Sequence, residues 1–120
     1  MKNLLLAALA SLSLAAAPAT LHSHLLIDAG KQFLLGGGQP GAFTVQGRNV
    51  GPVPVAVREE PRTGPAIGRG TLAPGATARL KFAAGSTARL INLGTKQAVL
   101  ELDVTGDTGQ LRMTYEPAQR

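Results

Sequence analysis

The chain has no cysteine and no tryptophan, and only one tyrosine and three phenylalanines among its 120 residues. Without cysteine it has no disulfide framework, no thiolate metal ligand, no iron–sulfur cluster and no cysteine nucleophile. So few aromatic side chains also disfavour an aromatic sugar-binding platform and the recognition of single-stranded nucleic acid by stacking. These absences remove a large part of enzyme and nucleic-acid-binding chemistry.

Motifs for catalysis are also scarce. Gly36-Gly37-Gly38 is followed by no Gly-Lys-Ser/Thr, so a flexible linker fits it better than a phosphate loop. Ser86 follows Gly85 but lacks the glycine two residues after the serine that a nucleophile elbow has, and it is predicted to lie in a turn. Glu101 and Asp103 share a predicted outward face, where carboxylates mainly increase solubility. The sequence therefore predicts no catalytic residues, and a hydrolase with an unrecognised site is the weakest of three functional alternatives.

The first 19 residues have the pattern of a bacterial signal peptide, which would form a helix before the mature domain. Met1-Lys2-Asn3 is a short positive start, an apolar stretch follows from Leu4 to Ala17, and Ala17-Pro18-Ala19 supplies small residues before a cut after Ala19. About 14 apolar residues are too few for a membrane span, which needs roughly 20. We therefore expect a mature chain that starts at Thr20, has no transmembrane segment and is located in the periplasm or outside the cell.

From residue 42 onward, apolar and polar residues alternate in short runs that Gly, Pro or Asn-x-Gly breaks separate, which predicts antiparallel β-strands. We expect an N-terminal segment at 20–41 with one or two strands and a Gly-rich linker, a sandwich domain at 42–116 and a tail at 117–120. The strands at 43–48 and 53–57 are predicted to form a hairpin. The residues expected to face the core are Phe43, Val45, Gly47, Val53, Val55, Val57, Ala78, Leu80, Phe82, Ala88, Leu90, Ala98, Leu100, Leu102 and Val104.

Two internal repeats support this division into strands. Gly75-Ala76-Thr77-Ala78-Arg79-Leu80 recurs as Gly85-Ser86-Thr87-Ala88-Arg89-Leu90, which predicts two similar strands joined by a hairpin turn at 83–86. Asn49-Val50-Gly51 recurs as Asn92-Leu93-Gly94, and each copy is predicted to be a turn that follows a strand. Seven to nine short strands fit a two-sheet antiparallel sandwich with one modest core.

The segments 44–51 and 71–78 carry a family resemblance. Thr44-Val45-Gln46-Gly47-Arg48-Asn49-Val50-Gly51, followed by Thr71-Leu72-Ala73-Pro74-Gly75-Ala76-Thr77-Ala78, resembles bacterial immunoglobulin-like domains of the cell-adhesion-related type. The resemblance covers roughly residues 43 to 104. It implies an immunoglobulin-like sandwich that serves as an extracytoplasmic binding or spacer module, and it implies no catalytic residues.

The only two histidines suggest a metal site near the expected mature N-terminus. If Thr20 is the first residue, its amine, two amide nitrogens and the His22 imidazole can surround Cu(II) or Ni(II) in a plane, with His24 assisting from an axial side. His22-Ser23-His24-Leu25 is also similar to the start of periplasmic copper-resistance sandwiches, although the downstream Asp-x-His of those proteins is missing here. The alternative is a solvated chain start without a metal.

The basic residues suggest a binding surface. Twelve Lys and Arg against seven Asp and Glu give a formal net charge of +5, and several of the cations are predicted to point outward. Those assigned to ligand binding are Arg48, Arg79, Lys81 and Arg89. The sequence thus predicts an exported, non-catalytic interaction or structural module for a protein or an anionic polymer, with no nucleic-acid partner and no cofactor. The alternative function is periplasmic binding of Cu(II) or Ni(II).

Overall fold

The computed structural model describes residues 20–118, and all of its regular structure in that range is β-strand. The signal peptide expected at 1–19 and the last two positions of the expected tail lie outside the described residues. No helix within 20–118 is long and apolar enough to cross a membrane. The nine strands are β1 (Leu21–Ile27), β2 (Lys31–Gly36), β3 (Phe43–Asn49), β4 (Val55–Glu60), β5 (Ile67–Leu72), β6 (Thr77–Phe82), β7 (Thr87–Ile91), β8 (Ala98–Gly106) and β9 (Met113–Pro117).

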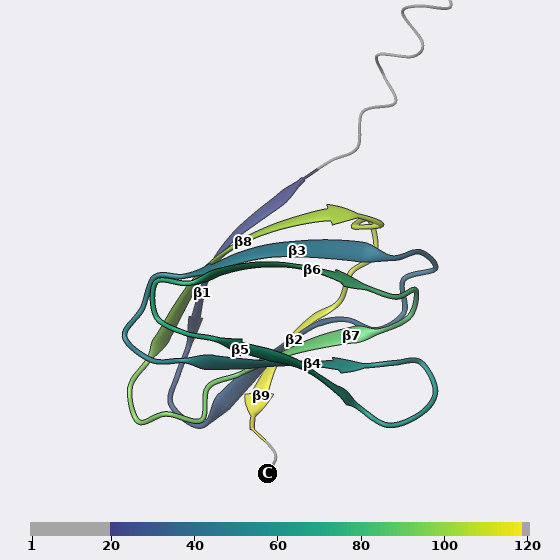
Figure 1. Ribbon diagram of the computed structural model, residues 1–120. Helices are drawn as coiled ribbons and strands as arrows, with labels where there is room; N and C mark the ends of the chain where they lie inside the picture. Colours follow the sequence, from purple (N-terminus) through teal and green to yellow (C-terminus); the bar gives the residue numbers. More distant parts are fainter. Residues whose placement is uncertain (1–19, 119–120) are drawn as a thin grey trace, which may run out of the picture.

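The strands form two sheets that face each other (Figure 1). One is a four-stranded sheet in the order β1-β8-β3-β6, and the other is a five-stranded sheet in the order β5-β4-β7-β2-β9. Every paired strand is antiparallel to its neighbour. The predicted all-β class and the two-sheet antiparallel sandwich are therefore confirmed.

The strand order has a simple logic, because the first eight strands form one long antiparallel ribbon folded over itself. β1 pairs with β8, β2 with β7, β3 with β6 and β4 with β5. The loop at 61–66, which joins β4 to β5, is therefore the closed end of the ribbon. This is the strand order of a jelly roll, with β9 added at one edge. It differs from the order of an immunoglobulin sandwich, in which strands A, B, E and D form one sheet and C, F and G the other.

The two predicted hairpins are wrong. β3 and β4 belong to different sheets, and so do β6 and β7, so the turns after Asn49 and at 83–86 carry the chain from one sheet to the other. Among the nine strands described, β4 and β5 are the only consecutive ones that pair. The alternation of residues shows which side of a strand is buried, but it carries no information on which strand lies next to it.

The segment 20–41, expected to precede the sandwich, contributes a strand to each sheet. β1 forms one edge of the four-stranded sheet, and β2 lies between β7 and β9 in the other. The pairing of Lys31 with Pro117 also places the first residue of the expected tail within β9. The described sandwich thus runs from Leu21 to Pro117.

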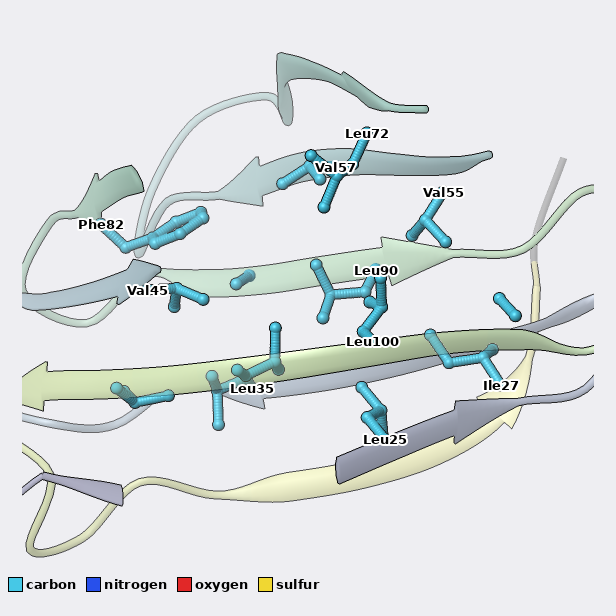
Figure 2. Packing of buried hydrophobic residues seen from close by; sticks show 14 of the residues in the cluster. Leu25, Ile27, Leu35, Val45, Val55, Val57, Leu72, Phe82, Leu90 and Leu100 are labelled. Carbon is cyan, nitrogen blue, oxygen red and sulfur yellow. The ribbon is translucent and has the colours of Figure 1, made fainter. Parts of the chain in front are cut away.

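The core lies between the sheets, and Figure 2 shows its aliphatic side chains interleaved. Phe43 and Phe82 stack there with their ring centroids 5.2 Å apart. All fifteen positions predicted to face inward do so: most are buried, while Ala78 and Leu80 are half-buried and pack against the core. Burying a Val, Leu or Phe side chain contributes about 1.5–3 kcal/mol, so this cluster is the main source of stability.

The two Asn-x-Gly repeats lie at equivalent crossings between the sheets. Asn49 donates from Nδ2 to the carbonyl oxygens of Val53 and Leu72, both at 2.8 Å, and its Oδ1 accepts from the Gly51 N–H at 3.0 Å. The same three bonds recur at the second repeat, where Asn92 bonds Lys96, Ile27 and Gly94. Both asparagines are fully buried. The predicted turns are confirmed, and each one ties the start of a crossing to the end of a third strand.

Candidate functional site

The outer side of the four-stranded sheet, called here the four-stranded face, carries most of the residues that the sequence singles out. Side chains of β1, β8, β3 and β6 alternate inward and outward, and those opposite one another in the ladder form rows across all four strands. Two rows each hold three ionisable side chains: His22–Asp103–Gln46–Arg79 and His24–Glu101–Arg48–Thr77.

Two histidine–carboxylate pairs occupy one half of this face. His22 Nδ1 contacts Asp103 Oδ1, and His24 Nδ1 contacts Glu101 Oε2. The His22 side chain is 74% exposed and the His24 side chain 59% exposed. Solvent screens such pairs, so each adds at most about 1 kcal/mol to stability. Their importance lies in orienting the two imidazole rings.

Three of the four basic residues assigned to ligand binding lie on the other half of the face. Arg48 projects from β3, and Arg79 and Lys81 project from the edge strand β6, all three exposed to solvent. Arg79 donates from Nη1 to Gln46 Oε1 at 3.2 Å. The four-stranded face is therefore divided, with histidines and carboxylates over β1 and β8 and cations over β3 and β6.

Arg89, the fourth of these residues, lies on the opposite side of the molecule. It belongs to β7 in the five-stranded sheet, where its side chain is only 15% exposed. Its Nη2 donates to Gln32 Oε1 at 3.0 Å, and its Nη1 lies 3.6 Å from Glu60 Oε2. The four residues therefore do not form one surface, and Arg89 acts within a local polar network.

The metal arrangement expected at the chain start meets a geometric obstacle. Leu21 and His22 are in β1, opposite Val104 and Asp103, so their amide nitrogens belong to a paired strand. A planar site with the Thr20 amine needs those amides to leave the ladder and the His22 ring to leave Asp103. Within 20–118, no cluster of three or more His, Cys, Asp or Glu side chains could hold a metal ion.

A buried ion pair that the sequence did not reveal closes one side of the sandwich. Glu59 continues the inward alternation of Val55 and Val57 and is 8% exposed. Its carboxylate accepts from Arg69 at 2.5 Å and from the Ala83 N–H at 3.0 Å. Burial alone would raise the pKa of Glu59, but the Ala83 hydrogen bond and the Arg69 guanidinium together hold it below the ordinary value.

The Arg69 side chain completes this closure. Its guanidinium carbon lies 5.1 Å from the centre of the Phe82 ring, and its Nη1 donates to the Lys81 carbonyl oxygen at 3.0 Å. Arg69 thereby links edge strand β5 to edge strand β6 across the two sheets. Because these contacts hold two sheet edges together, the cluster has a structural role. The only signal for it in the sequence was an acidic residue at an inward position.

Two open hollows are lined mainly by apolar groups. One, of about 200 Å³, lies between β1 and β9, with Leu21, Phe33 and Met113 among its lining residues. The other, of about 270 Å³, lies on the five-stranded sheet beside Pro54, Ile91 and Leu93. Of the described residues, His22 is the one ionisable side chain that lines either hollow, and it lines the first.

Comparisons with known proteins leave the site to be judged on its own geometry. No protein-family model, curated protein or solved structure matches the chain.

Proposed function

We propose that this chain is an exported, non-catalytic interaction module that binds an anionic polymer through the cationic half of its four-stranded face. One observation carries the proposal: Arg48, Arg79 and Lys81 are exposed together on the neighbouring strands β3 and β6. Because β6 is an edge strand, these cations extend to the rim of the sheet, where an extended chain has access to them.

Glu101 is the ladder partner of Arg48, but among the described residues neither Glu101 nor Asp103 forms an ion pair with Arg48, Arg79 or Lys81. Asp103 and Glu101 lie on β8, and each contacts a histidine of β1 on the side away from β6. A repeating anionic polymer gains from several such contacts at once, because each contact releases condensed counterions. The signal-peptide pattern of residues 1–19 favours a polymer outside the cytoplasm, such as an acidic polysaccharide.

The test is retention of the purified protein on immobilised heparin across a salt gradient. We expect Arg48→Ala/Arg79→Ala/Lys81→Ala to lower the affinity at least tenfold at low salt and to flatten the salt dependence, because three ionic contacts are lost. The control is Arg58→Ala/Arg62→Ala/Lys96→Ala, which removes the same charge from exposed positions elsewhere. Equal losses in the two triple variants, or no binding by the unmodified protein, would refute the proposed polymer site.

A further inference from the structure

Two histidine–carboxylate pairs lie side by side on the four-stranded face, and the proposed polymer binding does not use them. His22 and His24 lie two residues apart on β1, point to the same side of the sheet, and contact carboxylates that lie two residues apart on β8. We propose that the two imidazoles bind one divalent transition-metal ion through their Nε2 atoms. The inference does not rest on polymer binding, because it uses the other half of the face.

The carboxylates determine which nitrogen of each ring is available. In a neutral imidazole one nitrogen carries the proton and the other carries a lone pair. A carboxylate at Nδ1 keeps the proton there and leaves the lone pair on Nε2. Metal-binding histidines in proteins almost always donate the other ring N–H to a carboxylate, a backbone carbonyl or a water, which fixes the tautomer and increases the basicity of the coordinating nitrogen. Asp103 and Glu101 supply that partner to His22 and His24 respectively.

The strand geometry brings the two rings within reach of one ion. Residues i and i+2 of a strand lie about 7 Å apart on the same face, and an imidazole extends far enough for two such rings to tilt toward a shared ion. Both side chains are more than half exposed. Among the strands of residues 20–118, β1 is an edge strand and pairs with β8 alone. Solvent therefore reaches the two rings both from the outer face of the sheet and from its open edge.

The surrounding charge favours a cation. Asp103 and Glu101 lie directly beside the two rings, whereas the nearest cation in these rows, Arg48, lies beyond β8 on β3. Nitrogen ligands of this kind suit Cu(II), Ni(II) and Zn(II), with Cu(II) bound most tightly. Two imidazoles leave the remaining coordination positions to water or to a donor from another molecule.

This site differs from the one expected at the chain start. The chain-start site needs the amine of Thr20 and the ring of His22, and it gives His24 only an assisting role. The site proposed here needs both rings and both carboxylates, and it needs no free amine. The full 120-residue chain distinguishes the two sites experimentally. In that chain Thr20 is bonded to Ala19 and has no free amine, so only the site proposed here can form.

The experiment is a Cu(II) titration of the full chain, followed by calorimetry and by the nitrogen hyperfine pattern in electron paramagnetic resonance. We expect one equivalent of copper with two imidazole nitrogens. His22→Ala and His24→Ala should each raise the dissociation constant at least tenfold. As tests of the positioning residues, Asp103→Asn and Glu101→Gln should raise it about tenfold without changing the melting temperature.

Glu60→Gln, which changes an exposed carboxylate on the other sheet, is the matched control and should leave copper affinity unchanged. The proposal is overturned if His22→Ala/His24→Ala binds copper as the unmodified protein does. It is also overturned if His24→Ala has no effect, or if copper binds only to a chain that begins at Thr20 and shows four nitrogen ligands. Heparin retention is measured on the same variants, so failure of the metal site and failure of the polymer site are distinguishable.

Discussion

Replacing Asn49 with aspartate is expected to lower the free energy of unfolding by roughly 3–5 kcal/mol. The Asn49 amide donates to two carbonyl oxygens, each 2.8 Å away, and the side chain is fully buried. A carboxylate at this position would point an oxygen at two other oxygens without a proton between them. Urea unfolding followed by circular dichroism measures the change.

Asn49→Ala and Asn92→Ala should each cost about 2–4 kcal/mol, because each leaves two carbonyl groups without a donor; both are buried at Asn49, and at Asn92 the Ile27 carbonyl is buried and the Lys96 carbonyl partly buried. The two values should be similar, since both residues make the same three hydrogen bonds. Val50→Ala, at the adjacent position that is 45% exposed, is the control and should change stability by less than about 0.5 kcal/mol. A loss below about 1 kcal/mol in Asn49→Asp would contradict this account of the crossings.

Removing the buried carboxylate in Glu59→Ala is expected to cost about 3 kcal/mol, because it leaves the Arg69 charge and the Ala83 N–H without their partner. The adjacent variant Glu60→Ala removes a carboxylate that is 51% exposed and 3.6 Å from its arginine. That variant should cost less than about 1 kcal/mol. Thermal unfolding of the two variants under identical conditions tests the contrast, and equal losses would show that Arg69 does not depend on Glu59.

The same carboxylate should make stability depend on pH in the acid range. The pKa of Glu59 is lower in the folded protein than its ordinary value of 4.5. The unfolded chain therefore takes up a proton first as the pH falls. The stabilisation by Glu59 is complete above about pH 4.5 and is lost as the pH falls through the folded-state pKa. Glu59→Gln should be less stable than the unmodified protein at pH 7, and the difference should narrow toward pH 3. A difference that stays constant with pH would contradict the assignment.

The faces of the strands could be predicted from the sequence because side chains alternate along any strand, whatever lies beside it. Phe43, Val45, Leu100 and Val104 face inward as the pattern indicates. Glu101 and Asp103 face outward for the same reason. Strand partners were predicted less well. The pattern favoured a hairpin after Asn49, whereas β3 pairs with β6 and β8.

The candidate site was only partly visible in the sequence. His22 and His24 stood out as the only histidines, and Arg48, Arg79 and Lys81 stood out by their outward phase. The carboxylates that orient the histidines are 77 and 81 residues away along the chain, so no local pattern could assign them. Arg89 has the same phase as Arg79 in the repeated motif, yet it lies on the opposite sheet.

The sequence by itself determined the all-β class, the buried sides of most strands and the turns after Asn49 and Asn92, because these depend on local alternation and on the backbone preferences of Gly, Pro and Asn. It did not reveal strand β5, whose residues are rich in glycine. Only the tertiary structure decided that the strands roll up as a folded ribbon, that Glu59 meets Arg69, and that β1 lies against β8 with its histidines beside two carboxylates. The physical reason is that pairing joins residues far apart in the chain. Which distant strands meet is settled by how all nine strands together bury one core.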